Sequence, residues 1–143
     1  AGYYFVTICT QHRHKILGRV VGGDAHIAPS VHLSEIGIIA EKYIKNIDLK
    51  YENVYVDKYV IMPNHIHMIL VLKDGAMWSS PPTNAIPNII RSFKTMITKE
   101  IGISIFQESY YDHIIRDEAD YLTKWNYIDT NPAKWADDEY FNS

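Results

Sequence analysis

The chain has 143 residues, of which 47% are hydrophobic and 22% charged, and its formal net charge is −3. This length predicts a single domain, residues 1–143, and the composition is typical of an ordinary globular protein. The single cysteine, Cys9, excludes an internal disulfide framework and favours a reducing, cytoplasmic location. The acidic balance argues against a protein that coats nucleic acid non-specifically, but it leaves room for a local basic face. No apolar run approaches the roughly 20 residues that a membrane helix needs, so we expect no membrane partner.

The N-terminal part of the chain predicts a strand, a basic loop and a small hairpin. Residues 3–10 alternate in side-chain character as a strand does. Residues 11–19 form the most basic loop of the sequence, and Arg13 and Lys15 within it are candidate DNA-binding residues that would contact phosphate. A solvated connection without a ligand is the alternative for this loop. A Gly-Gly-Asp turn then predicts the tip of a small hairpin within residues 19–28.

The middle of the chain predicts a helix and then two paired strands. Ser34 is a candidate N-cap for a helix whose apolar stripe runs through residues 36–47. Strand-like alternation occupies residues 53–62, and the apolar run His65–Leu72 has the length of a buried strand. The Pro-Asn pair between these runs suits a tight turn, so we expect an antiparallel hairpin.

The next part of the chain predicts an exposed loop and an amphipathic helix. Residues 73–84 are polar and rich in turn-forming residues, as is typical of an exposed loop. Pro87 suits the first turn of a helix whose buried stripe extends to Ile101. Arg91 and Lys94 fall outside that stripe and are further candidate DNA-binding residues, although a solvated helix face would carry cations too.

The end of the chain predicts a last strand and a last helix. Residues 105–116 predict an extended segment that enters the strand, and Asp117 can cap the helix, which ends before Pro132. The element order predicts an α+β fold of the ferredoxin-like βαββαβ type, with a central antiparallel sheet plus a C-terminal helix. In this topology the His65–Leu72 strand is central, the two crossover helices cover one face of the sheet, and the last helix can lie near the other.

His65 and His67 form a His-x-His pair on the predicted central strand. Because side chains alternate along a strand, both imidazoles point to the same face. Burial of two imidazoles on a mostly apolar strand costs free energy unless their nitrogens have a binding partner, and a divalent metal could be that partner. Two hydrogen-bonded structural histidines are the alternative. A histidine-triad hydrolase would need a third alternating histidine, where this chain has Ile69.

Tyr127 and Asn131 lie four residues apart at the end of the last predicted helix, so they share one side of it. If that side faces the histidines, then His65, His67 and Asn131 could surround a metal, with the tyrosine hydroxyl alongside. Nitrogen and amide-oxygen ligands suit Mg²⁺ or Mn²⁺ better than a structural zinc. A metal with open positions beside a phenol is equipped to attack a phosphodiester.

Two motifs in this sequence carry a resemblance to a known family. They are residues 62–67, Met-Pro-Asn-His-Ile-His, and residues 127–132, Tyr-Ile-Asp-Thr-Asn-Pro. Together they resemble the paired signature of the single-tyrosine HUH transposases, and most of all that of the REP-associated tyrosine transposases and related insertion-sequence transposases. The resemblance extends to residues 5–7 and 92–94, and to Gln107 with residues 110–116, and so spans nearly the whole chain.

The resemblance implies that residues 1–143 are a single HUH transposase domain that cleaves and rejoins single-stranded DNA at palindromic, hairpin-forming ends. It implies that Tyr127, on the C-terminal helix, is the catalytic nucleophile and forms a 5′-phosphotyrosine intermediate. It also implies that His65 and His67 are metal ligands and that Asn131 is the third ligand of Mg²⁺ or Mn²⁺. Strand exchange would then use a homodimer, or the same tyrosine twice.

Two other functions remain open at this point. A catalytically inactive or domesticated relative would bind a nucleic-acid hairpin without cutting it, and the acidic balance of the chain suits such a module. A metal-dependent phosphodiesterase that acts through water would leave Tyr127 with a structural role. A Tyr127→Phe variant separates the three functions, because only the first needs the phenol oxygen.

Overall fold

A four-stranded antiparallel sheet forms the centre of the molecule, with its strands in the order β4-β5-β1-β6. The structure is a computed structural model that describes residues 2–23, 27–73, 85–138 and 140–141. In chain order its elements are β1 (Gly2–Cys9), η1 (Gln11–Arg13), β2 (Gly18–Val21), β3 (Ser30–Leu33), α1 (Glu35–Lys50), β4 (Val54–Met62), β5 (His65–Leu72), α2 (Ala85–Ile101), β6 (Tyr111–Ile115), α3 (Glu118–Thr130) and η3 (Pro132–Asp137).

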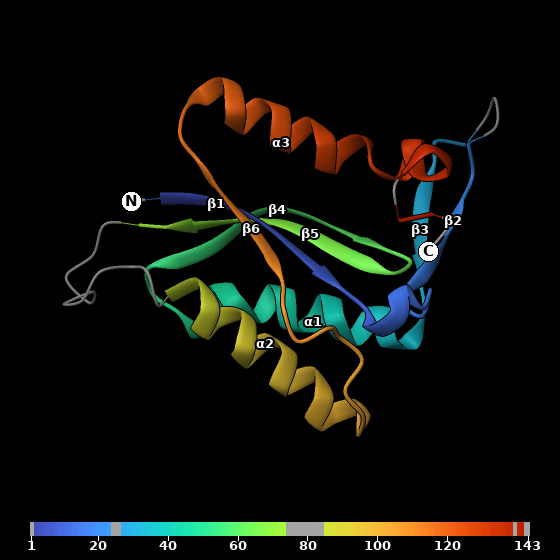
Figure 1. Ribbon diagram of the computed structural model, residues 1–143, viewed down its shortest axis with the longest axis horizontal. Helices are drawn as coiled ribbons and strands as arrows, with labels where there is room; N and C mark the ends of the chain where they lie inside the picture. Colours follow the sequence, from blue (N-terminus) through green and yellow to red (C-terminus); the bar gives the residue numbers. More distant parts are fainter. Residues whose placement is uncertain (1, 24–26, 74–84, 139, 142–143) are drawn as a thin grey trace.

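The helices lie on both faces of this sheet, as Figure 1 shows: α1 and α2 cover one face and α3 covers the other. The central strands are β5 and β1, so the strand with the two histidines is central. The predicted ferredoxin-like α+β fold is therefore confirmed, with α3 as the additional C-terminal helix. No helix in the described part of the chain is long and apolar enough to cross a membrane.

Local sequence signals position the helices and the central hairpin as predicted. The Ser34 hydroxyl accepts a hydrogen bond from the Gly37 N–H at the start of α1. The Asp117 carboxylate accepts one from the Asp120 N–H at the start of α3. Both side chains thus satisfy an N–H that the first helical turn leaves without a partner. The pair Met62↔His65 closes the β4–β5 hairpin across a two-residue turn, as the Pro-Asn pair predicts.

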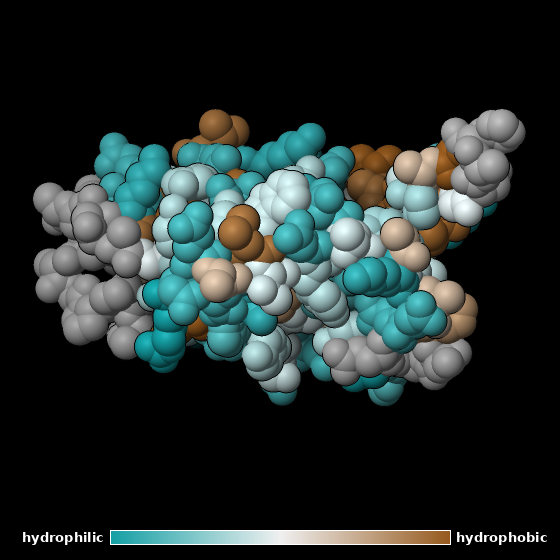
Figure 2. Space-filling model, turned by 90° about the horizontal axis from the view of Figure 1, so that it is seen from above, coloured by the Kyte–Doolittle hydropathy of each residue, from teal (hydrophilic) through white to brown (hydrophobic). Residues whose placement is uncertain are grey.

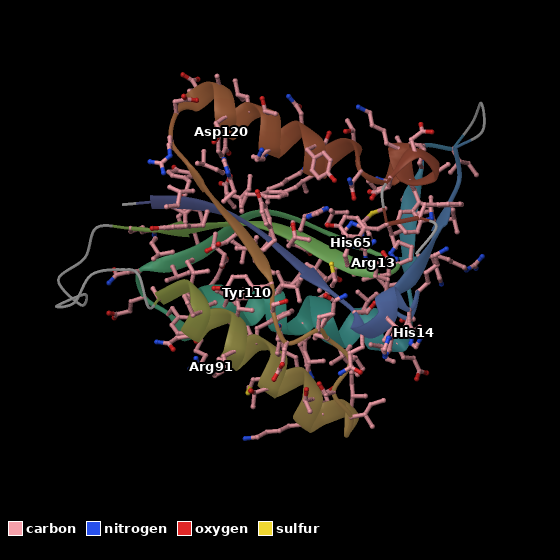
Figure 3. The ribbon with its side chains drawn as sticks, viewed as in Figure 1. Arg13, His14, His65, Arg91, Tyr110 and Asp120 are labelled. Carbon is pink, nitrogen blue, oxygen red and sulfur yellow. The ribbon has the colours of Figure 1, made fainter. Side chains whose placement is uncertain are left out.

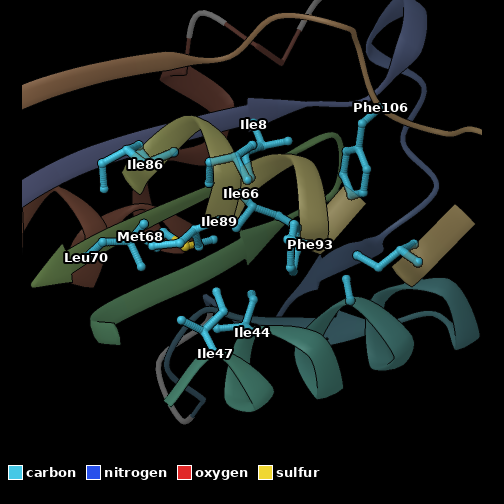
Figure 4. Close-up of a cluster of buried hydrophobic side chains, with 14 of the residues drawn as sticks. Ile8, Ile44, Ile47, Ile66, Met68, Leu70, Ile86, Ile89, Phe93 and Phe106 are labelled. Carbon is cyan, nitrogen blue, oxygen red and sulfur yellow. The ribbon is translucent and has the colours of Figure 1, made fainter. Parts of the chain in front are cut away.

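The larger apolar core fills the space between the sheet and the helices α1 and α2 (Figure 4). Residues of β1 and β5 that point to this side meet residues of α1 and α2, and most of them have no exposed surface. Burial of this kind contributes roughly 25 cal/mol for each Å² of apolar surface removed from water. The labelled members are Ile8, Ile44, Ile47, Ile66, Met68, Leu70, Ile86, Ile89, Phe93 and Phe106.

The apolar cluster under α3 is much smaller. It consists of Phe5, Ile69, Val71, Ile115 and Ile128, and Ile128 is the only α3 residue that is buried. Seen from the side of α3, the molecular surface is mainly hydrophilic (Figure 2). The two faces of the sheet are therefore covered in different ways.

The small hairpin after the basic loop differs from its prediction. β2 and β3 pair from Gly18↔Leu33 to Val21↔Ser30, so the hairpin spans residues 18–33 instead of 19–28. Gly22 and Gly23 both have positive φ, 82° and 91°, and begin the connection between the strands. The prediction placed the whole hairpin too close to this turn, because pairing beyond the turn has no local sequence signal. Most of the predicted loop at 73–84 lies outside the described residues.

Candidate metal centre and nucleophile

His65 and His67 lie next to each other on the face of β5 that α3 covers, and their ring centroids are 4.6 Å apart. Ile69 and Val71 follow them on the same face, as strand alternation predicts. His65 has no exposed surface and His67 is 2% exposed. Figure 3 shows His65 between the sheet and the C-terminal segment. The pair is therefore fully enclosed by protein.

The end of α3 brings Tyr127 and Asn131 to these histidines. Asn131 follows the last residue of α3, keeps helical backbone angles and is 3% exposed. Tyr127 is 38% exposed, and its ring centroid lies 5.1 Å from that of His67 and 6.1 Å from that of Phe5. Four side chains that the sequence analysis selected thus meet in one place, all from the same chain.

Three atoms at this place lack a hydrogen-bond partner. Among the described residues, the buried side-chain nitrogen and oxygen atoms without such a partner are His65 Nε2, His67 Nε2 and Asn131 Oδ1. Leaving a buried polar atom without a partner costs about 1–3 kcal/mol, so three together require an explanation. Each of these atoms can donate a lone pair to a metal, and they belong to the three predicted ligands. The donor set therefore fits a divalent ion.

The protonation state of the histidines also fits this purpose. Burial lowers the pKa of His65 to about 4; the nearby Asn131 amide opposes this shift, and the charge of Arg13 adds to it. Burial, together with the charge of His65, lowers the pKa of His67 well below its usual value. Both imidazoles are therefore neutral near neutral pH, which is the form that binds metals. The described residues hold no group of three or more His, Cys, Asp or Glu side chains suited to a metal, so a ligand set here would be completed by the amide.

Comparison with known proteins finds relatives of this chain. No protein-family model matches the chain. An uncharacterized protein of Haemophilus influenzae is 30% identical over 160 residues, which cover 98% of this chain and 85% of that protein. A protein of the same organism named "Putative REP-associated tyrosine transposase" is 29% identical over 82 residues, which cover 52% of this chain and 47% of that protein.

A solved structure of a REP-associated tyrosine transposase bound to a REP hairpin has the same fold, with a TM-score of 0.65 at 24% identity. The match covers 93% of this chain and 67% of that chain. The chain is a homologue of the REP-associated tyrosine transposases. The resemblance that the two motifs predict is thereby confirmed.

In this transposase homologue, the second nitrogen of each histidine ring has a polar partner. His67 Nδ1 lies 2.8 Å from the Thr7 hydroxyl of β1, and His65 Nδ1 lies 2.8 Å from the side-chain oxygen of Asn64. Hydrogen bonds of this kind orient an imidazole and hold it in place. Thr7 and Asn64 belong to the stretches that carry the family resemblance, but nothing local predicts that they contact the rings.

The C-terminal segment covers the histidines from the outside. The ring of Tyr140 lies 4.2 Å from the ring of His65 and 6.3 Å from that of His67, and the ring of Trp135 lies 6.1 Å from that of His65. No pattern in the sequence predicted this cover. Its sequence signal is the group of aromatic residues Trp135, Tyr140 and Phe141 after Pro132.

Two of the candidate DNA-binding residues lie at this same end of the sheet. Arg13 stacks on the ring of Tyr140 at 4.8 Å, and Lys15 lies 4.8 Å from the ring centroid of Phe141. Figure 3 shows Arg13 close to His65. The basic loop thus reaches the C-terminal segment and the histidine pair together.

The other two candidates, Arg91 and Lys94, lie on α2, on the opposite face of the sheet (Figure 3). Arg91 is exposed, bonds to Asn88 and lines a hollow of about 440 Å³. The Lys94 ammonium donates to the carbonyl oxygens of residues 107, 108 and 109, at 2.7, 3.1 and 3.4 Å. Burial lowers the pKa of Lys94. The structure therefore separates this pair from the histidines, and it gives Lys94 a part in holding the segment before β6.

An irregularity in β4 holds α3 against the sheet. The pairing of β4 with β5 shifts between Val56 and Lys58, so Asp57 is an extra residue in a β-bulge. Asp57 accepts a hydrogen bond of 2.5 Å from the Tyr121 hydroxyl. The Lys58 ammonium lies 2.9 Å from the Asp129 carboxylate and 4.0 Å from the ring centroid of Trp125. Two adjacent β4 residues thus bind the helix that carries Tyr127, which the regular alternation of the sequence did not predict.

Proposed function

We propose that this transposase homologue cleaves and rejoins single-stranded DNA at palindromic, hairpin-forming ends, with Tyr127 as the nucleophile and Mg²⁺ or Mn²⁺ as the cofactor. The proposal rests mainly on one observation. Side-chain atoms of His65, His67 and Asn131 that could donate lone pairs to a metal have no hydrogen-bond partner, and the partly exposed Tyr127 lies next to them. The related transposase of solved structure binds a REP hairpin, which supports the same class of ligand here.

The three ligand residues would hold the ion through His65 Nε2, His67 Nε2 and Asn131 Oδ1. A divalent ion bound there supplies charge that stabilises the non-bridging oxygens of a phosphodiester as the phosphorus is attacked. The enclosing protein keeps the imidazoles neutral, so they remain available as ligands near neutral pH.

Tyr127 would perform the covalent step. Its oxygen forms a bond to phosphorus while the bond from phosphorus to the 3′ oxygen breaks, which leaves a 5′-phosphotyrosine and a free 3′-hydroxyl. The phenol loses one proton and the 3′ oxygen gains one, so the step is balanced without a co-reactant. Attack by the 3′-hydroxyl of another strand reverses the exchange and needs no external energy source. Packing of Phe5 and His67 against the ring orients the phenol.

Single-stranded DNA would approach this site along the basic loop. Arg13 and Lys15 lie at the same end of the sheet as the histidines, so they are the better placed of the proposed phosphate contacts. Arg91 and Lys94 on the far face would contact a different part of the nucleic acid. In this arrangement Tyr127 and the histidines of one chain would form a whole site, and a homodimer would serve to cut two ends at once.

One observation favours the alternative of a hairpin-binding module that does not cut. His65 and His67 are enclosed, and Tyr140 and Trp135 cover them, so a phosphodiester cannot reach the pair without displacement of the C-terminal segment. A module that has lost its chemistry would tolerate this cover permanently.

The test is a denaturing-gel assay with labelled single-stranded palindromic DNA, with Mn²⁺ and with chelator. We expect a metal-dependent, denaturant-resistant adduct that Tyr127→Phe abolishes. Tyr43→Phe is the matched control, because Tyr43 lies on α1, which covers the opposite face of the sheet, and it should leave the adduct intact. Cleavage without an adduct would favour the water-based phosphodiesterase, and hairpin binding without cleavage would favour the binding module.

A further inference from the structure

The side-chain amide of Asn64 is held in one orientation. Asn64 lies in the turn between β4 and β5 and has no exposed surface. Its nitrogen lies 2.9 Å from the backbone oxygen of Tyr140 and 3.2 Å from that of Arg13. A backbone oxygen can only accept hydrogen bonds, so the amide NH₂ must be on that side. The reversed amide would place oxygen against oxygen at both contacts.

This orientation decides where His65 carries its proton. With the NH₂ group directed away, the Asn64 oxygen is the atom that lies 2.8 Å from His65 Nδ1. An amide oxygen only accepts, so Nδ1 must be the N–H of the ring. A neutral imidazole has one N–H and one lone pair, and the lone pair is therefore on Nε2. The other tautomer would place the lone pair of Nδ1 against a lone pair of the Asn64 oxygen.

We propose that Asn64 is a positioning residue that holds His65 in its Nδ1–H tautomer and thereby presents the Nε2 lone pair to a divalent ion. The proposal rests on the proposed function, in which His65 is a metal ligand. Asn64 itself does not touch the ion or the DNA. It acts through the imidazole, as partners of metal-binding histidines do.

The hydrogen-bond partner of His67 does not select one tautomer of its ring. The Thr7 hydroxyl lies 2.8 Å from His67 Nδ1, and a hydroxyl can donate or accept. Thr7 is therefore compatible with both tautomers of His67. Of the two ring contacts, only the one from Asn64 specifies a tautomer.

Hydrogen bonds also hold the main chain of the turn that contains Asn64. Its backbone oxygen accepts hydrogen bonds from the Thr10 N–H at 3.0 Å and the Thr10 hydroxyl at 3.1 Å. The neighbouring Pro63 oxygen accepts one from the Leu17 N–H at 2.9 Å. The main chain of the turn and the side chain of Asn64 are thus fixed independently of the histidine ring.

The first test needs no substitution in Asn64. A long-range ¹H–¹⁵N spectrum of the metal-free wild-type protein near neutral pH reports the tautomer of each histidine, and His65→Gln identifies the His65 signals. We expect His65 to be almost entirely in the Nδ1–H form. A His65 ring protonated on Nε2 would overturn the proposal. The spectrum involves neither DNA nor Tyr127, so its outcome is independent of whether the protein forms an adduct.

The second test compares two substitutions by the binding of Mn²⁺ alone, measured by calorimetry. Asn64→Leu removes the acceptor, and we expect a roughly 10- to 100-fold loss of Mn²⁺ affinity and a mixture of His65 tautomers. Asn64→Asp keeps an oxygen opposite Nδ1 and should retain both affinity and tautomer. It should also unfold at a lower temperature, because its second oxygen meets the two backbone oxygens. A folded Asn64→Leu variant with wild-type affinity would refute the proposal, and if that variant does not fold, the wild-type spectrum decides.

Discussion

The two faces of the sheet are stabilised by different kinds of interaction. On one face α1 and α2 bury rows of apolar residues, whereas α3 buries only Ile128 on the other. The buried polar side chains of the described residues are Thr7, Thr10, Asn64, His65, His67 and Asn131, and they form or adjoin the histidine site. One face therefore supplies most of the stability, and the other can hold polar groups that would weaken a core.

The contact between α3 and the sheet follows from this difference. With little apolar surface to bury, the helix depends on the polar clasp that Asp57 and Lys58 form with Tyr121, Trp125 and Asp129. Such contacts are directional and fix the rotation of a helix more than they stabilise it. They suit a helix whose task is to hold Tyr127 next to His67.

The largest effect should come from the apolar face. Phe93→Ala, in the core between α2 and the sheet, should lower the free energy of unfolding by about 3–5 kcal/mol, because it leaves a cavity. Urea unfolding measures this loss. The folded fraction should still bind Mn²⁺ with wild-type affinity. Loss of Mn²⁺ binding by the folded variant would contradict the idea that one face stabilises the fold while the other binds the metal.

Acid should act on the other face. The folded protein keeps the pKa of His65 at about 4, below the ordinary value of 6.5, so between these values the unfolded chain binds a proton that the folded chain does not. Stability therefore falls as the pH drops from about 6.5 towards 4, by up to about 1.4 kcal/mol per pH unit from this residue. His67 shifts in the same direction and adds to the slope.

Urea unfolding at a series of pH values checks this sign. His65→Gln should reduce the slope, because it removes the group whose pKa is lowered in the folded state. Stability that rises on acidification through this range would show that the histidines are protonated in the folded state.

The smallest effect on stability should come from the clasp. Lys58→Met keeps the length of the side chain and removes its charge, so both the ion pair with Asp129 and the cation–π attraction to the Trp125 ring are lost. We expect a loss of about 0.5–1 kcal/mol, since the pair is partly exposed. Adduct formation should fall by a larger factor than this stability loss alone would cause. A matched Lys45→Met change in α1, away from α3, should alter neither quantity.

Much of this fold could be predicted because its signals are local. The caps at Ser34 and Asp117 and the turn before His65 act within a few residues of themselves. The bulge at Asp57 could not be predicted, because β4 alternates without a visible interruption. Its position depends on which residues β5 and α3 offer as partners.

The candidate site likewise has parts that the sequence predicted and parts that it did not. His65, His67, Tyr127 and Asn131 come from two motifs, and the βαββαβ order explains why they can meet. The cover by Tyr140 and the hydrogen bond from Asn64 to its backbone depend on a segment about 76 residues away, and no periodicity reports that contact. Lys94 was a candidate DNA-binding residue because a sequence does not distinguish an exposed cation from a buried one. In the structure its ammonium group donates hydrogen bonds to three carbonyl oxygens.

The extra residue in β4 also bears on how this chain can change its length. Val54 and Val56 face the larger core before the bulge, and Tyr59 and Ile61 face it afterwards, so the bulge exchanges even for odd positions. Deletion of Asp57 alone would make the strand regular and leave the side chains on both sides of it on their present faces, because Val56 and Lys58 already pair with adjacent residues of β5. It would, however, remove the carboxylate that accepts the hydrogen bond from Tyr121. The sheet can therefore lose one residue at this point, whereas deletion of a single paired residue elsewhere in β4 would turn part of the strand to the wrong face.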